Sequence, residues 1–191
     1  MDDKQFGIVI LAAGQSKRFK GNKLTAEYKG KMLFMHTLDT VEDVGGCPVY
    51  VVTAQDVIKN YAERLGYVVV KNDRPELGIS LSLRLGLRAC LEDHPGVDGV
   101  LFCVCDQPEL EANTIKKILR EGAEYPGCII RLRADEVYGN PCLWDRIYFD
   151  ELMGLEGDSG GRQIMGRHEG AIRYIDVPAE ELSDIDCRSD L

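Results

Sequence analysis

The chain lacks the segments that would direct it to a membrane and the charge that would direct it to nucleic acid. No apolar run in its 191 residues reaches the ~20 residues that a membrane-spanning helix needs. The first residues contain no basic region followed by an apolar core, so we expect no signal peptide. The net charge of −9 argues against the basic surface that neutralises nucleic-acid phosphates. We therefore expect neither a membrane nor nucleic acid among its partners.

The chain also lacks the closely spaced cysteine pairs of common metal-binding and redox motifs. The chain has seven cysteines but no Cys-x-x-Cys, which argues against a zinc ribbon or a thioredoxin-type motif. Cys103 and Cys105 alternate on a predicted strand, where we expect them to be small buried apolar side chains. A reducing cytoplasm is the expected location.

Two common phosphate-binding motifs are absent as well. A P-loop requires Gly, four residues and then Gly-Lys-Ser/Thr, whereas here six residues separate Gly14 from Gly21 and Leu24 follows Lys23. A dinucleotide fingerprint requires Gly-x-Gly-x-x-Gly, and Gly14 stands alone. The three histidines lie beside no candidate nucleophile.

What the chain does have is a buried strand that leads into a cationic turn. Four apolar residues at 8–11 predict a strand buried on both faces. Two alanines and Gly14 follow, and such small residues let a ligand approach the backbone closely. Open α/β sheets bind ligands at the carboxyl ends of their strands. The stretch predicts a polyphosphate site there, with four cations in seven residues: Lys17, Arg18, Lys20 and Lys23.

Helical and strand patterns alternate along most of the chain. This alternation predicts one domain over residues 1–191, an α/β fold with a mostly parallel, doubly wound sheet and helices on both faces. Residues 24–31 are polar and are predicted to be a loop. The predicted strands are 8–11, 49–52, 67–70, 99–104, 128–132 and 172–177, with an extended piece at 139–144. The predicted helices are 32–43, 54–65, 80–93, 111–124, 149–155 and 162–167.

Asp106 is the strongest candidate for a metal ligand. It follows the predicted strand 99–104 directly, and Pro108 prevents that strand from continuing in the middle of a sheet. Mg²⁺ (or Mn²⁺) is commonly held by one or two carboxylates and by substrate phosphates. The alternative is an aspartate that forms a turn by bonding its own backbone.

The opening stretch resembles the L-x-A-G-x-x-x-R-x-G-x-x-K motif of the nucleotidyltransferases with a three-layer Rossmann-like fold. In that family the motif wraps the triphosphate of a nucleotide. The resemblance implies that Arg18 and Lys23 neutralise phosphate charge and act with Asp106 in catalysis. The matching residues are Leu11, Ala13, Gly14, Arg18, Gly21 and Lys23.

Later motifs narrow the resemblance to the molybdenum cofactor cytidylyltransferases. Asp106-Gln107-Pro108 resembles their D-Q-P element, and Leu11-Ala12-Ala13-Gly14 resembles their L-A-A-G. Residues 78–83 resemble their G-x-S-x-S-L segment, which implies that Gly78, Ser80 and Ser82 border the nucleotide. We also expect Ser80 to be a helix N-cap.

Three further elements of this family appear with departures. Asn140 replaces histidine in a G-H-P element, and residues 157–162 resemble G-D-x-G-A-R with glycine at 161. The resemblance implies that Asn140, Asp158 and Arg162 lie on the acceptor side. A C-terminal D-I-D element implies that Asp186 is a second carboxylate ligand of magnesium. The alternatives are a flexible turn at 157–161 and a charged terminal tail without such a role.

The resemblance implies an enzyme that transfers CMP from CTP to the molybdenum cofactor, a molybdopterin phosphate, and releases pyrophosphate. A client molybdenum enzyme, such as a hydroxylase, is then a possible partner. One alternative is transfer to another phosphorylated acceptor such as a sugar phosphate, which Asn140 favours. The other is a non-catalytic cofactor carrier or insertion chaperone, which the altered tail at 187–189 favours.

Overall fold

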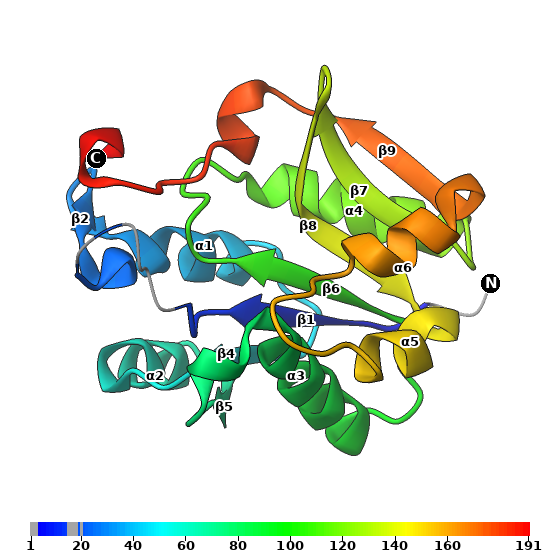
Figure 1. Ribbon diagram of the computed structural model, residues 1–191, viewed down its shortest axis with the longest axis horizontal. Coiled ribbons are helices and arrows are strands. Elements are labelled where there is room, and N and C mark those ends of the chain that lie inside the picture. Colours follow the sequence, from blue (N-terminus) through cyan, green and yellow to red (C-terminus); the bar gives the residue numbers. More distant parts are fainter. Residues whose placement is uncertain (1–3, 15–18, 20) are drawn as a thin grey trace.

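A seven-stranded sheet runs through the middle of the molecule (Figure 1), seen here in a computed structural model that describes residues 4–14, 19 and 21–191. The strand order is β5-β4-β1-β6-β8-β7-β9. All neighbouring pairs are parallel except the two that involve β8, so the predicted mostly parallel sheet is confirmed. The strands are β1 (Phe6–Leu11), β4 (Val49–Thr53), β5 (Val68–Lys71), β6 (Gly99–Val104), β7 (Ile129–Ala134), β8 (Val137–Asp145) and β9 (Ile172–Asp176).

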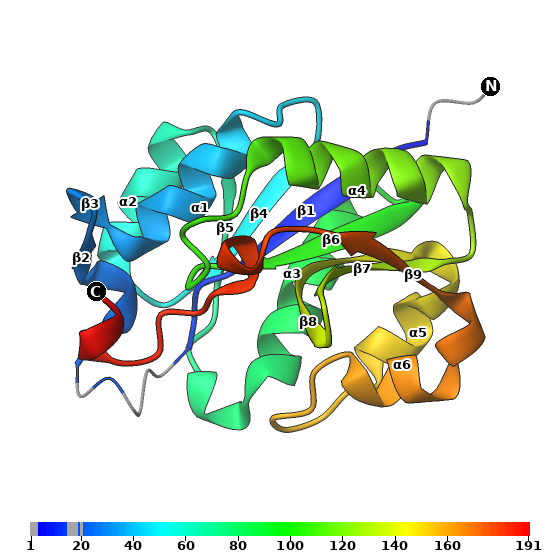
Figure 2. The same ribbon diagram turned by 90° about the horizontal axis from the view of Figure 1, so that it is seen from above.

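Helices cover both faces of this sheet, as Figure 2 shows from above. The side of α1, α2 and α4 buries Ile8 and Ile10 of β1, and the side of α3, α5 and α6 buries Val9. The expected three-layer α/β fold is therefore confirmed. Among the described residues no helix is both long and apolar enough to cross a membrane. The helices are α1 (Leu33–Glu42), α2 (Asp56–Arg64), α3 (Ile79–Asp93), α4 (Ala112–Glu124), α5 (Phe149–Met153) and α6 (Arg162–Arg167).

Helix α3 packs very closely on the centre of the sheet. A Cβ atom built at Gly86 would lie 2.3 Å from Cγ1 of Val9 and 3.0 Å from Cγ2 of Val52. Only a glycine therefore lets the helix approach β1 and β4 this closely. This contact brings the amino terminus of α3 to the edge where β1 and β4 end.

The polar stretch at 24–31 is more ordered than the sequence predicts. A 3-10 turn at Lys23–Thr25 is followed by a small hairpin of β2 (Glu27–Tyr28) and β3 (Lys31–Met32). Lys29 and Gly30 turn the chain with φ of +46° and +86°. The loop prediction was wrong here, because two-residue strands are too short to show an alternating pattern.

The start of α3 also differs from the prediction. The N-cap residue is Gly78, with φ of +88°, and the Ser80 side chain forms no capping hydrogen bond. A Cβ atom at Gly78 would lie 2.4 Å from the carbonyl carbon of Gly157. The Ser80 amide donates instead to the Gly157 carbonyl oxygen at 3.2 Å. A distant loop, rather than a serine cap, thus fixes the start of this helix.

Because α3 has no room at Gly86, we predict that Gly86→Val lowers the free energy of unfolding by about 1–3 kcal/mol through overpacking. Urea denaturation measures this change. A matched control is Gly166→Ala on α6, where an added Cβ atom meets nothing within 4 Å. The control should be neutral or stabilising by up to about 1 kcal/mol. Equal stabilities for Gly86→Val and the unmodified protein would contradict the close packing.

Candidate active site

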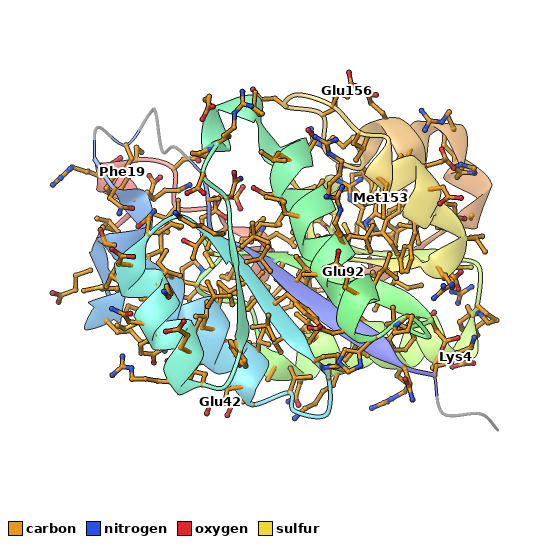
Figure 3. All side chains as sticks on the ribbon, turned by 90° about the horizontal axis from the view of Figure 1, so that it is seen from below. Lys4, Phe19, Glu42, Glu92, Met153 and Glu156 are labelled. Carbon is orange, nitrogen blue, oxygen red and sulfur yellow. The ribbon has the colours of Figure 1, made fainter. Side chains whose placement is uncertain are left out.

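The topology brings the predicted phosphate loop and Asp106 to one edge of the sheet. Strands β1 and β6 are parallel neighbours, with Leu11 beside Val104, so the segments that follow them leave side by side. Figure 3 labels Lys4, which precedes β1, and Phe19, which lies in the segment after β1; the two are on opposite sides of the view. Arg18, the other predicted catalytic cation, lies outside the described residues.

Lys23 joins the N-terminal loop to two predicted metal ligands. Its Nζ lies 2.8 Å from Oδ2 of Asp106 and 3.4 Å from Oδ1 of Asp186. The lysine is buried, at 9% exposure, whereas both carboxylates are partly open to solvent. A single ammonium group therefore offsets the repulsion between two carboxylates from distant parts of the chain.

The C-terminal tail that carries Asp186 is held by backbone contacts. The Ile185 amide donates to the Asp106 carbonyl oxygen at 2.9 Å. Oδ2 of Asp190 accepts from the amides of Asp186 and Cys187 at 2.9 and 2.8 Å. Hydrogen bonds from the Cys187 thiol and from these amides lower the pKa of Asp190 to about 2. The tail thus follows a defined path beside β2, as both ribbon views show (Figures 1 and 2).

A cavity of about 390 Å³ opens beside Lys23. Its lining contains most of the residues predicted to contact the nucleotide, while Ala12 and Ser80 are fully buried and do not line it. The predicted residues in its lining are Leu11, Ala13, Gly14, Lys23, Gly78, Ser82, Asp106, Asp158 and Asp186.

Asn72 is a residue of this region that the sequence did not single out. It is fully buried, and its Nδ2 donates to Oγ of Ser82 at 2.9 Å. Its Oδ1 accepts from the Arg74 amide at 3.0 Å. Asn72 therefore fixes both the loop after β5 and the orientation of the Ser82 hydroxyl.

A second cavity, of about 520 Å³, adjoins the first. Leu11, Ile79, Val104 and Asp158 line both cavities, so the two share a wall. The second cavity contains the three residues predicted for the acceptor side: Asn140, Asp158 and Arg162. The lining also includes residues to which the sequence gave no role, among them Gln107, Arg131, Tyr138, Trp144 and Asp184.

Charged groups shape this second cavity. Burial raises the pKa of the Cys142 thiol to about 12, against the opposing effect of Arg131 and Arg162. Loss of hydration raises the pKa of Asp184 to about 6, with repulsion from Asp106 as the next cause. The cavity therefore combines two guanidinium groups with a carboxyl group whose pKa lies above its usual value.

A profile of the MobA-like NTP transferase domain matches residues 8–172. The chain belongs to the family of MobA-like NTP transferase domains. This match confirms the predicted MobA-like nucleotidyltransferase superfamily and the predicted class of enzyme, a nucleotidyltransferase.

Known members and solved structures agree with this assignment. The bifunctional protein GlmU of Rhizorhabdus wittichii is 30% identical over 136 residues, covering 68% of this chain and 29% of GlmU. A probable molybdenum cofactor guanylyltransferase of Thermococcus sibiricus is 38% identical over 63 residues, covering 32% of each protein. The matches thus span less than a third of each of these two relatives.

The crystal structure of Rv0371c from Mycobacterium tuberculosis H37Rv has a TM-score of 0.81 to this chain at 26% identity. The match covers 98% of this chain and 96% of that one. The manganese complex of Rv0371c has a TM-score of 0.76 at 25% identity, over 91% and 89% of the two chains.

Trp144 packs against Gly161, the position at which the chain departs from the G-D-x-G-A-R motif that residues 157–162 resemble. A Cβ atom at Gly161 would lie 2.2 Å from Cζ2 of Trp144. The indole ring therefore occupies the space that an alanine methyl group would need. The absence of a side chain at Gly161 therefore leaves room for a large aromatic side chain beneath the loop.

The carboxylates of this NTP transferase domain fit a hard divalent cation that is completed by its substrate. Among the described residues no group of three or more His, Cys, Asp or Glu side chains could hold a metal by itself. Two carboxylates meet instead at Lys23, and all three side chains line the cavity of about 390 Å³. Mg²⁺ commonly binds through one or two carboxylates, with phosphate oxygens and water as the remaining ligands.

Because Lys23 separates two carboxylates, we predict that Lys23→Met lowers the free energy of unfolding by about 1–3 kcal/mol in metal-free buffer. The variant leaves partly buried carboxylates without their shared cation. Urea denaturation compares it with Lys71→Met, which removes a fully exposed ion pair to Asp73. The control should leave stability almost unchanged, because water screens an exposed ion pair. If both variants lose the same small amount, Lys23 is not the link between these segments.

Proposed function

We propose that the protein transfers CMP from CTP to a molybdopterin phosphate and releases pyrophosphate. The observation that carries the proposal is the pair of adjoining cavities beside Lys23, Asp106 and Asp186. The first cavity has the small residues and the cation that a triphosphate needs. The second has the arginines that an anionic acceptor needs. Because the two cavities share lining residues, a nucleotide in the first would lie next to an acceptor in the second.

Transfer requires a phosphate oxygen of the acceptor to attack the α-phosphate of CTP. One P–O bond forms, and the bond to the β-phosphate breaks, so the electron pair leaves with pyrophosphate. Both reactants are anionic, and the site must offset their repulsion. Lys23 supplies one positive charge beside Asp106. Bound Mg²⁺ or Mn²⁺, held by Asp106 and Asp186, would supply further charge stabilisation at the phosphates.

The proposed reaction makes little demand for a general base. A phosphate monoester is largely ionised near neutral pH, because its second pKa is about 6. No histidine lines either cavity among the described residues. The site therefore acts mainly by positioning and by charge neutralisation, as is common in phosphoryl transfer.

The names of the relatives support the proposed acceptor more directly than they support the proposed nucleobase, cytosine. Two of them are named probable molybdenum cofactor guanylyltransferases. We propose CTP because Ala13 stands where guanylyl-transferring relatives more often carry a second glycine. The manganese complex of Rv0371c supports a divalent cation.

Asn140 gives a specific reason to keep a second acceptor in view. It lines the acceptor cavity at the position where the family motif has histidine. A sugar phosphate is therefore the second candidate acceptor for the same chemistry. A non-catalytic carrier is less well supported, because a carrier has no use for the Lys23–Asp106 pair.

For the proposed reaction, we predict that Asp106→Asn lowers the rate of CTP-dependent pyrophosphate release about 100-fold or more, since a metal contributes several kcal/mol to transition-state stabilisation. A coupled pyrophosphate assay with molybdopterin and Mg²⁺ measures the rate. Asp176→Asn, on the exposed edge strand and paired with Arg133, is the matched control and should retain full activity. Full activity of Asp106→Asn would overturn the assignment of this carboxylate.

The preference for CTP over the other nucleoside triphosphates can be tested separately. In the presence of Mg²⁺, CTP should raise the melting temperature more than GTP, UTP or ATP at equal concentration, because a ligand of the native state stabilises it by mass action. A thermal-shift series measures this. A larger shift with GTP would keep the nucleotidyltransferase but replace the proposed nucleotide.

A further inference from the structure

Arg131, on β7, is a cavity residue that neither the motifs nor the proposed chemistry accounts for. It lies in the lining of the second cavity. Its Nε is buried and has no hydrogen-bond partner. Among the described residues it forms no ion pair, whereas its neighbour on the same strand, Arg133, pairs with Asp176. A buried donor without a partner is costly, so Arg131 is a candidate to bind a water molecule or a ligand in this cavity.

The Arg131 side chain is fixed in place by Tyr138. Its guanidinium carbon lies 5.1 Å from the centroid of the Tyr138 ring, which also lines the cavity. The Tyr138 ring in turn packs on Tyr174, with 5.1 Å between the ring centroids. A guanidinium group held against aromatic rings loses little further freedom when it binds a ligand oxygen.

A second guanidinium group lies nearby. Arg131 and Arg162 both act on the pKa of Cys142, so both positive charges lie close to that buried thiol. Arg162 belongs to a motif of the family, whereas Arg131 belongs to none that we identify. Two arginines in one cavity are suited to an oxygen-rich or anionic ligand, which each can bind through two N–H donors.

The sheet register puts Arg131 far from the reacting centre. Arg131 pairs with Cys142 and Cys142 with Phe102, which precedes Asp106 by four residues. Strand β6 ends at Val104, two residues after Phe102, so the level of Arg131 lies about 7 Å before that end at about 3.3 Å per residue, and Asp106 follows the end. A ligand that touches both Arg131 and the reacting centre must therefore reach past the end of β6.

We propose that Arg131 is an acceptor-selecting residue that binds an oxygen of the acceptor remote from the phosphate that reacts. The inference rests on the proposed function, since that function sets which end of the acceptor reaches Asp106. It favours an extended acceptor with a planar ring and a hydrogen-bond-accepting oxygen at its far end. We expect a compact sugar monophosphate to reach only one of the two groups.

Equilibrium binding tests this without relying on turnover. Isothermal titration would measure molybdopterin binding to the full chain, with Mg²⁺ and a non-hydrolysable CTP analogue present. Arg131→Met should weaken molybdopterin binding about 10- to 100-fold, and Arg131→Lys should recover only part of the loss, because lysine lacks the planar fork. Binding of the CTP analogue should stay within about twofold in every variant.

Arg133→Met is the matched control. Arg133 lies two residues along β7 on the same face, pairs with Asp176 at 2.7 Å and does not line the cavity. It should leave molybdopterin binding unchanged. Equal affinities for Arg131→Met and Arg133→Met would overturn the inference, and so would a wild-type protein that binds no molybdopterin.

A pyrophosphate assay with molybdopterin and with a sugar monophosphate separates this inference from the proposed function. If the wild type releases pyrophosphate with molybdopterin but Arg131→Met binds it normally, the function stands and the selecting role fails. If molybdopterin binds through Arg131 but the wild type releases no pyrophosphate, the selecting role stands and the proposed reaction fails. Turnover with the sugar monophosphate that is insensitive to Arg131→Met would contradict the requirement for a long acceptor.

Discussion

The Lys23 ammonium group lies between the carboxylates of Asp106 and Asp186, and three remote parts of the chain meet at this contact. Lys23 comes from the segment after β1, Asp106 from the end of β6, and Asp186 from the C-terminal tail. Two carboxylates drawn this close would repel each other without a cation. The architecture of the cleft therefore depends on positive charge at this point, whether from lysine alone or from lysine with a metal and its phosphates.

The sheet explains why the two cavities adjoin. Strands β1 and β6 end at the same edge, and the antiparallel strand β8 begins there, so Asn140 reaches the same cleft from the opposite chain direction. Helix α3 reaches this edge because Gly86 lets it approach β1 closely. The contact of Gly78 with Gly157 then ties the loop of the second cavity to the wall of the first. A nucleotide in the first cavity and an acceptor in the second would thus lie next to each other.

The sequence predicted the parts of the site that depend on local patterns. The apolar run of β1 and the position of Asp106 after β6 were enough to predict one cleft, because the carboxyl ends of neighbouring parallel strands lie together. Arg131 and Tyr138 were missed, because their meeting depends on the pairing of β7 with β8, and no local motif encodes that register. The prediction that Ser80 caps helix α3 was wrong for a similar reason. The Gly157 loop, which accepts the Ser80 amide hydrogen bond, is about 80 residues away in the chain.

A crystal structure with Mn²⁺ and CTP tests the central claim most directly, with the manganese located from its anomalous signal. The account predicts one Mn²⁺ bound by carboxylate oxygens of both Asp106 and Asp186, with phosphate oxygens among its other ligands and Lys23 turned toward the triphosphate. Manganese at another place, or a nucleotide bound while Lys23 still joins the two carboxylates and no metal lies between them, would contradict it.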